Sequence, residues 1–395
     1  MMLGDEGYCG SVSYQKLEET IKSITGYEYV LPTHQGRAAE RILYGQLLRP
    51  GCLVISNCFY STTKGNIEEK AHAKTIALPQ HPIVGELKLT EPFHGNMDIT
   101  ELQQLLAQRR RDVGCVIVTL TANDICGQPV SMENVRQVSR VCRSYDLPVV
   151  LDACRYAENA WFVKTREHGF ADASLEHIAR EAFSYGDACI VSAKKDGFGN
   201  VGAFIGIRGD RALYEKCLQE LCLTQGFPTN GGISGRSMEA LAVGLRESLD
   251  LDYLQYRMSQ VSFLTDLIAD AGIPTVWGSH VYVDAGAILD HMPREHYPAW
   301  ALANALYVEG GIRGYEFGRV NYGDGYTGLD MLRFALPRRV YTNRHLEYVA
   351  EVLRYVAENK QAVSGYCVDW APPVMRHFLG TFKPIRSEVE DDTMM

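Results

Sequence analysis

The feature that most constrains the fold of this chain is an alternation of short apolar runs with helical patterns in its first half. Between the runs, residues recur at helical spacing; in 131–146, for example, Ser131 is a candidate N-cap and Val135 and Val138 lie one turn apart. This alternation predicts right-handed βαβ units in a mostly parallel sheet, which binds ligands at the carboxyl ends of its strands. The apolar runs, each predicted to be a strand buried on both faces, are 52–57, 74–78, 115–121, 147–153, 188–193 and 202–207.

The second half of the chain predicts a smaller domain. A long helical pattern covers 234–270, a turn and a strand follow in 272–286, and 345–360 again has apolar residues at helical spacing. We therefore expect the following domains: a large one at 1–271, a small α+β one at 272–360, and a C-terminal segment at 361–395 that returns to the active site and ends in a frayed acidic tail.

Composition argues against several classes of protein. The formal net charge of −9 is unlike that of a nucleic-acid binder, which usually carries a basic face. The apolar runs are far shorter than the roughly 18 to 20 residues that span a bilayer, and the acidic start MMLGDEGYCG does not resemble a secretory leader. The 11 cysteines are scattered without a CxxC pair, which predicts reduced thiols and no structural zinc site. We expect a cytoplasmic protein without nucleic-acid or membrane partners.

Three charged residues lie at the carboxyl ends of two predicted strands. Lys194 and Lys195 come directly after 188–193, where lysines are commonly just solvated; a neighbouring cation, however, lowers the pKa of an amine that must form a Schiff base. Asp152 ends the preceding predicted strand, where an aspartate is often a helix cap. Paired with a Schiff-base lysine, such a carboxylate instead keeps a pyridine nitrogen protonated.

A third segment, around Gly36, favours the binding of an anion. Gly36 permits close backbone approach, the helix predicted to start there offers unpaired N–H groups, and Arg37 adds a charge. Alone this pattern is weak, since many Gly-Arg pairs merely start helices. A candidate phosphate site, an aspartate and a lysine follow one another in this order along the chain. Together they predict pyridoxal 5′-phosphate as the cofactor. The match to GxGxxG at 197–202 is dismissed as a dinucleotide site, because a strand follows it and not a helix.

Two further residues have both a structural and a functional interpretation. Arg333 suits a substrate carboxylate because its guanidinium forms a fork, although a surface ion pair explains it equally well. Tyr8 is a candidate general acid, although a single tyrosine is more often packed.

Several segments together resemble the β-eliminating lyases of aromatic amino acids, the tryptophanases and tyrosine phenol-lyases. The resemblance runs from Met1 to about Phe382 and implies a fold type I, pyridoxal-phosphate-dependent enzyme with a mostly parallel seven-stranded sheet and a smaller domain. It also implies β-elimination on an aromatic amino acid, a homo-oligomer (tetramer or dimer) and a potassium ion. The segments that carry it are MMLGDE, PTHQGRAAE, GQPVSM, DACRYAENA, SAKKD and PRRVYT.

The resemblance implies a role for each matching residue. Lys195 would hold the cofactor and later take the substrate α-proton, Arg333 would bind the substrate carboxylate, and Tyr8 would protonate the leaving ring across a subunit interface. Glu6 and the Asn200 carbonyl would help to hold potassium. The other residues implied to bind the cofactor are Gln35, Gly36, Arg37, Tyr60, Asn123, Asp152, Arg155, Ser192 and Lys194.

Three positions favour L-tryptophan, cleaved to indole, pyruvate and ammonia. The phenol-lyases have an arginine where this chain has Phe317, and both His377 and Phe227 match the indole-lyases. Ser61 matches neither group, and Tyr60 replaces the family's phenylalanine. The family pattern begins before Met1, so we expect a missing N-terminal segment that supports potassium binding and assembly. A tyrosine phenol-lyase, a lyase of cysteine or another substituted amino acid, and a truncated, weakly active homologue stay open as alternatives.

Overall fold

The computed structural model describes residues 3–83 and 87–385, which form two compact units. Unit 1 comprises Met1–Pro82 with Glu91–Tyr256, and unit 2 comprises Ile83–Thr90 with Arg257–Met395. The chain changes unit on either side of Ile83–Thr90, and again inside α10 (Leu251–Asp270), between Tyr256 and Arg257. Within the described ranges, no helix has both the length and the apolar character needed to cross a bilayer.

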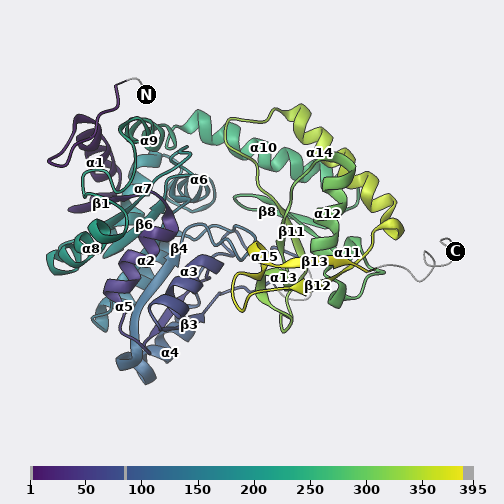
Figure 1. Cartoon of the computed structure of the whole chain (residues 1–395), viewed down its shortest axis with the longest axis horizontal. Helices are drawn as coiled ribbons and strands as arrows, with labels where there is room; N and C mark the ends of the chain where they lie inside the picture. Colours follow the sequence, from purple (N-terminus) through teal and green to yellow (C-terminus); the bar gives the residue numbers. More distant parts are fainter. Residues whose placement is uncertain (1–2, 84–86, 386–395) are drawn as a thin grey trace. The chain divides into compact units, whose positions relative to one another are not determined.

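Unit 1 is built on a seven-stranded sheet with the strand order β1-β7-β6-β5-β4-β2-β3 (Figure 1). The strands from β6 to β3 run parallel to their neighbours, while β7 is antiparallel to both β6 and β1, so β1 and β6 point the same way. The predicted mostly parallel α/β fold is confirmed. The strands are β1 (Tyr29–Thr33), β2 (Leu53–Ser56), β3 (Lys74–Ala77), β4 (Val113–Thr119), β5 (Val149–Asp152), β6 (Ala188–Ser192) and β7 (Ala203–Ile207).

Two strands depart from the sequence prediction. The connection 193–202 between β6 and β7 is too short to hold a crossover helix, so β7 folds back antiparallel. The strand β1 was missed because Pro32 interrupts its apolar run; it lies at the edge of the sheet, where a proline is tolerated.

Helices of unit 1 pack around this sheet. Ser131 caps α5 as predicted, its hydroxyl accepting a hydrogen bond from the Asn134 N–H at 3.1 Å. One apolar core joins the sheet to α2, η1 and α8. The helices are α1 (Val12–Thr25), α2 (Gly36–Leu47), α3 (Ser61–Gly65), the π-helix η1 (Asn66–Lys70), α4 (Ile99–Arg109), η2 (Arg110–Asp112), α5 (Met132–Ser144), α6 (Tyr156–Arg166), α7 (Leu175–Ser184), α8 (Arg211–Thr224) and α9 (Gly235–Glu247). The helical pattern predicted at 234–270 is therefore two helices, α9 and α10, separated at 248–250.

Unit 2 has its own antiparallel sheet, ordered β10-β11-β9-β8, and its own apolar core. Leu346, Leu353 and Val356, from the helical pattern seen in the sequence, are buried on α14 (Asn343–Glu358). The strands of the sheet are β8 (Thr275–Trp277), β9 (Val281–Asp284), β10 (Tyr315–Phe317) and β11 (Met331–Phe334), and a separate ribbon pairs β12 (Tyr366–Trp370) with β13 (Thr381–Pro384). The other helices are α11 (Ala285–Ile288), η3 (Arg294–His296), α12 (Pro298–Gly310), α13 (Arg319–Tyr322), η4 (Lys360–Ala362) and α15 (Arg376–Leu379).

Candidate active site

The carboxyl edge of the parallel strands of unit 1 gathers most of the predicted cofactor residues. Because β1 points the same way as β6, the loop after β1 reaches the same edge as the loops after β2, β4, β5 and β6. The antiparallel β7 begins at this edge, so Asn200 lies there too. The loops contribute Gln35 to Arg37 after β1, Tyr60 after β2, Asn123 after β4, Asp152 and Arg155 at the end of β5, and Ser192, Lys194 and Lys195 at the end of β6.

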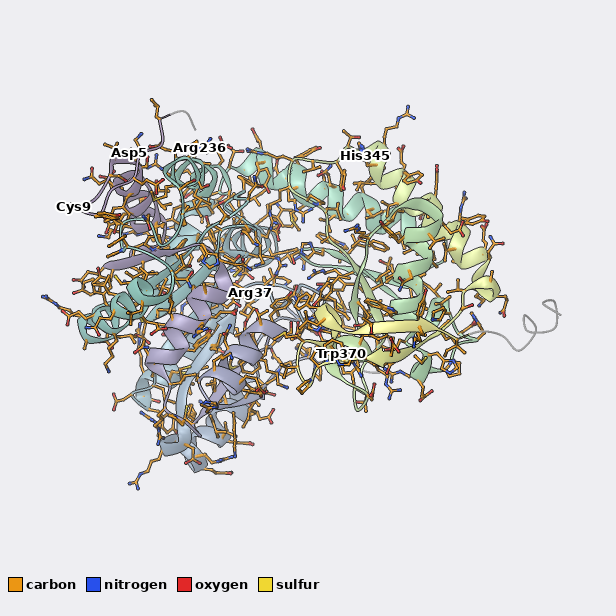
Figure 2. All side chains as sticks on the ribbon, viewed as in Figure 1. Asp5, Cys9, Arg37, Arg236, His345 and Trp370 are labelled. Carbon is orange, nitrogen blue, oxygen red and sulfur yellow. The ribbon has the colours of Figure 1, made fainter. Side chains whose placement is uncertain are left out.

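The first turn of α2 lies directly against the end of β6. A Cβ atom on Gly36 would stand 2.7 Å from Ser192 Cβ and 3.3 Å from its Oγ, so only glycine fits there. Gln35 is the N-cap in extended conformation, and its side chain makes no capping hydrogen bond. Arg37, labelled in Figure 2, extends from the same turn. Helix start, serine hydroxyl and arginine together fit a phosphate group.

Asp152 provides a buried acceptor in the same place. Its side chain is 8% exposed, and its Oδ1 has no hydrogen-bond partner among the described residues. The Cys154 thiol is hydrogen-bonded to the same carboxyl group, and its sulfur accepts from the Ser192 N–H at 3.2 Å. An unmatched buried carboxylate oxygen is costly, so the position fits the protonated ring nitrogen of a pyridine cofactor.

The two lysines lie in a tight turn after β6. The Lys195 N–H bonds to the Ser192 carbonyl at 3.2 Å, and Lys195 is half-buried whereas Lys194 is exposed. Burial, and then the nearby charges of Lys195 and Arg37, lower the pKa of Lys194. Lys194 thus lies within electrostatic reach of two other cations, which favours an anionic ligand.

Polar contacts fix the loops beside this turn. The Asp196 carboxylate accepts hydrogen bonds from the Ala157 N–H at 2.8 Å and the Glu158 N–H at 3.4 Å, which connects the lysine turn to the start of α6. Arg155 is buried and pairs with the fully buried Glu158 at 3.9 Å. Asn123 is buried as well, whereas Tyr60, the residue before α3, is half-buried.

The N-terminal candidates lie on another part of unit 1. The segment before α1 packs on the start of α9, where a Cβ on Gly235 would stand 2.3 Å from the Asp5 carbonyl oxygen. Tyr8 is 75% exposed and its ring lies 4.2 Å from that of Phe227. Glu6 and Asn200 are exposed. Among the residues that the structure describes, no group of three or more His, Cys, Asp or Glu side chains is placed to hold a metal ion.

In unit 2, three predicted residues come together on one tyrosine that the sequence analysis missed. The Arg333 guanidinium lies 4.7 Å from the centre of the Tyr315 ring and 5.0 Å from that of Phe317. The Tyr315 and His377 rings are 5.9 Å apart. Burial lowers the pKa of His377 to about 4, so its imidazole is neutral at pH 7. A tyrosine two residues before Phe317 on the same strand was the available signal, because such residues share one face of a strand.

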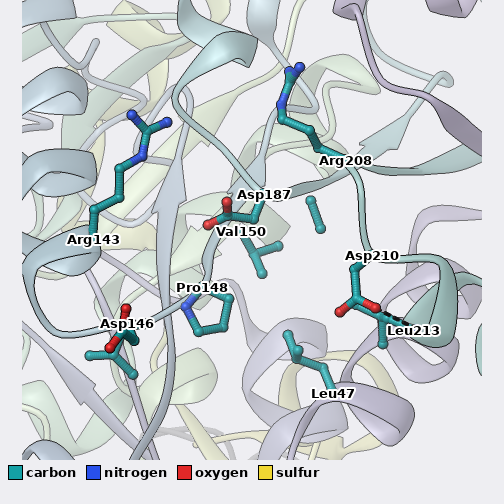
Figure 3. Close-up of a pocket in the computed structure, with 11 residues that line it drawn as sticks. Leu47, Arg143, Asp146, Pro148, Val150, Asp187, Arg208, Asp210 and Leu213 are labelled. Atoms are coloured by element: carbon teal, nitrogen blue, oxygen red, sulfur yellow. Dashed lines mark hydrogen bonds between the residues drawn. The ribbon is translucent and has the colours of Figure 1, made fainter.

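A hollow lies at the opposite, amino edge of the unit 1 sheet and contains none of the predicted site residues. It has a volume of about 420 Å³ and is shown in Figure 3. Its wall includes Asp187 and Arg208, but the Arg208 guanidinium already donates to the carbonyls of Gly26, Phe183 and Gly186. The predicted cofactor residues therefore lie at the carboxyl edge of the sheet, as expected for a parallel sheet, and not around this hollow.

Similarity to solved structures defines the class of protein first. The chain matches a serine palmitoyltransferase from Sphingomonas wittichii with a TM-score of 0.60 at 12% identity, covering 90% of this chain and 81% of that chain. A second match, titled "SPT with PLP", has a TM-score of 0.61 and covers 89% and 78% of the two chains. At this identity the match concerns the fold, which is that of fold type I pyridoxal-phosphate-dependent enzymes.

Sequence relatives then identify the family. The family model for β-eliminating lyases matches residues 1–352. A tryptophanase of Salinibacter ruber is 44% identical over 97% of this chain and 83% of its own length. A probable β-eliminating lyase of Trichomonas vaginalis is 41% identical (96% and 84%), and a tyrosine phenol-lyase of Symbiobacterium thermophilum is 38% identical (98% and 86%). The chain belongs to the β-eliminating lyase family and is a lyase, and the family implies pyridoxal phosphate as its cofactor.

Proposed function

We propose that this enzyme cleaves L-tryptophan to indole, pyruvate and ammonia. The relatives named above include both a tryptophanase and a tyrosine phenol-lyase, so their names do not choose the substrate. The observation that carries the proposal is the set of side chains around Arg333 in unit 2. Phe317 and a neutral His377 contribute an apolar ring and an uncharged ring there, and neither brings a cation for a phenolic oxygen.

The cofactor residues are proposed from the carboxyl edge of unit 1. When bound, pyridoxal phosphate supplies an electron sink for the pair of electrons left at the substrate α-carbon. Asp152 accepts a hydrogen bond from the ring nitrogen through its unmatched buried Oδ1. The remaining contacts to the cofactor are proposed as follows: Gln35, Gly36, Arg37, Ser192 and Lys194 at its phosphate, Tyr60 on the face of its ring, and Asn123 and Arg155 at the phenolic oxygen of the cofactor itself.

Three side chains are proposed to handle the substrate. Lys195 anchors the cofactor and afterwards takes the α-proton on its Nζ. It lies in the turn after β6 beside Lys194, whose pKa is lowered by burial and then by the charges of Lys195 and Arg37. Arg333 binds the substrate carboxylate; its guanidinium is already fixed by two rings, so little side-chain freedom is lost on binding. Tyr8, which is exposed, would deliver a proton from its hydroxyl to the leaving ring across a subunit interface.

Substrate choice follows from unpaired polar groups. A tyrosine substrate would bring a phenolic hydroxyl close to Phe317, which offers no hydrogen bond, and a buried hydroxyl without a partner loses about 1–3 kcal/mol. An indole ring has only one polar atom, a donor N–H. His377, whose neutral imidazole retains an acceptor nitrogen, is the residue proposed to favour it.

Potassium and location are proposed on the resemblance alone, whereas assembly is proposed on the resemblance together with one surface feature. Glu6 and the Asn200 carbonyl would hold a potassium ion, and the enzyme would be a cytoplasmic homo-oligomer, most simply a tetramer. The exposed Tyr8 and Phe227 pair supports a subunit contact at this part of unit 1. Size-exclusion chromatography with and without potassium tests the assembly and its dependence on potassium.

Pyruvate release from purified protein tests the substrate. The protein would be incubated with pyridoxal phosphate and potassium, and with tryptophan, tyrosine and cysteine in parallel, and Lys195→Ala is the inactive control. Pyruvate with an equal amount of indole from tryptophan, and little from the other two, is the expected result. Faster release from tyrosine or cysteine would replace the proposal with a phenol-lyase or another β-eliminating lyase.

A further inference from the structure

A buried carboxylate outside the proposed catalytic set lies between two groups of cofactor candidates. Glu40 is on α2, one turn after Gly36 and Arg37, and its side chain is 7% exposed. A buried carboxylate is stable only when nearby groups compensate for the loss of water. The partners of Glu40 therefore show what it holds in place.

Glu40 accepts hydrogen bonds from three side chains of α3 and η1. Thr63 Oγ1 donates to Oε1 at 2.5 Å, Thr62 Oγ1 donates to Oε2 at 3.2 Å, and Asn66 Nδ2 donates to Oε2 at 3.0 Å. All three donors lie within one stretch of seven residues that starts at Tyr60. One carboxylate thus fastens this stretch to α2.

A second contact strengthens the same connection. Asn66 Nδ2 also donates to the carbonyl oxygen of Arg37 at 3.3 Å. Tyr60 belongs to the fastened stretch, since its carbonyl accepts a hydrogen bond from the Lys64 N–H at 2.9 Å. Tyr60, proposed to lie on the cofactor ring, and Arg37, proposed to bind the phosphate, are therefore connected through Asn66 and Glu40.

The electrostatics place Glu40 close to the cofactor residues. Burial, and then the negative charge of Asp152, raise the pKa of Glu40 to about 7, while the hydrogen bonds from Thr63 and Asn66 and the charge of Lys195 act against this rise. A group that responds to both Asp152 and Lys195 lies beside the site and not in a remote part of the core.

We propose that Glu40 is a positioning residue, which acts through Thr62, Thr63 and Asn66 to hold the Tyr60 segment at a fixed place relative to the start of α2. The inference rests on the proposed function in one respect, the assignment of Tyr60 and Arg37 to the cofactor. It adds a residue that touches neither cofactor nor substrate.

A matched pair of threonine variants tests this role. Thr63→Val removes a hydroxyl bond between Glu40 and the Tyr60 segment, whereas the control Thr75→Val removes a hydroxyl bond between β3 and Glu68 of η1. Each apoprotein would be titrated with pyridoxal phosphate, the circular dichroism of the bound cofactor band recorded, and the urea midpoint measured. Thr63→Val should weaken cofactor binding by about tenfold and reduce the band, and Thr75→Val should leave both as in the wild type.

Variants of the carboxylate itself complete the test. Glu40→Leu should weaken binding at least as much as Thr63→Val, and Glu40→Gln should restore most of it because the amide can still pair with the hydroxyls. If Glu40→Leu does not fold, the comparison of Thr63→Val with the control Thr75→Val is by itself the test of the proposal. Wild-type affinity and band shape in Thr63→Val, or equal losses in Thr63→Val and Thr75→Val, would overturn the proposal. A wild-type enzyme that binds the cofactor but releases no pyruvate contradicts the proposed function and leaves this test valid.

Discussion

Replacing one α2 glycine by alanine should damage the site, whereas replacing another on the same helix should stabilise the protein. In Gly36→Ala the new methyl carbon would stand 2.7 Å from Ser192 Cβ, roughly 1 Å inside the 3.5–4.0 Å optimum of two carbon atoms. Ser192 cannot easily withdraw, because it ends β6, which is paired with β5 on one side and β7 on the other. Overpacking of this kind costs about 1–3 kcal/mol.

Gly45 provides the control because a Cβ there meets nothing within 4 Å. Gly45→Ala should raise the free energy of unfolding by about 0.5–1 kcal/mol, the usual gain from helix propensity. Gly36→Ala should lower it by at least about 1 kcal/mol and weaken the binding of pyridoxal phosphate to the apoprotein about tenfold or more. Urea unfolding and a cofactor titration measure the two effects. If both variants gained stability equally and bound the cofactor like the wild type, the close contact of Gly36 with Ser192 would not shape the phosphate site.

Three further predictions concern single side chains. Lys195→Ala should abolish the cofactor absorbance that borohydride can fix to the protein, and persistence of a fixable band would transfer the role to Lys194. His377→Phe should lower kcat/KM for tryptophan by roughly 10–100-fold; unchanged turnover would remove the imidazole from substrate choice. Burial raises the pKa of Glu316 from 4.5 to about 8. Between these pH values the folded protein therefore holds a proton that the unfolded chain has lost. The contribution of this proton to the free energy of unfolding is complete below about pH 4.5 and is lost as the pH rises through about 8. Glu316→Gln should flatten this decline in urea midpoints measured from pH 5 to 8, and an unchanged slope would contradict the assignment.

Sequence reasoning found the candidate residues of unit 1 because their chemistry and their order along the chain are distinctive. Asp152 is the last residue of β5, Lys195 follows β6 and Gly36 follows β1, and strands that point the same way end at one edge. The strand that positions Gly36 was nevertheless missed, because Pro32 disguises it. The fold could therefore be predicted as a class, whereas the antiparallel direction of β7 follows from the short connection 193–202, which the apolar pattern of the strand itself does not reveal.

Supporting residues were harder to predict because their importance comes from burial and not from residue type. Glu40 in a helical pattern looks like a surface charge, and only the fold shows that it is enclosed by Thr62, Thr63 and Asn66. The same holds for Tyr315. Only the pairing of β10 with β11 shows that its ring contacts the Arg333 guanidinium.

This dependence on neighbours bears on how substrate choice can change in the family. Phe317 is 4% exposed and its ring supports the Arg333 guanidinium at 5.0 Å, so this position serves two purposes at once. An arginine introduced at 317 would supply a partner for a phenolic hydroxyl, but it would also remove a cation–π contact of about 0.5–2 kcal/mol and place a second positive charge beside Arg333. The expected loss falls on the residue proposed to bind the carboxylate that every amino-acid substrate shares. Specificity for tyrosine therefore requires compensating changes around Tyr315 and His377, and a single exchange at 317 should lower activity toward all substrates before it favours any one of them.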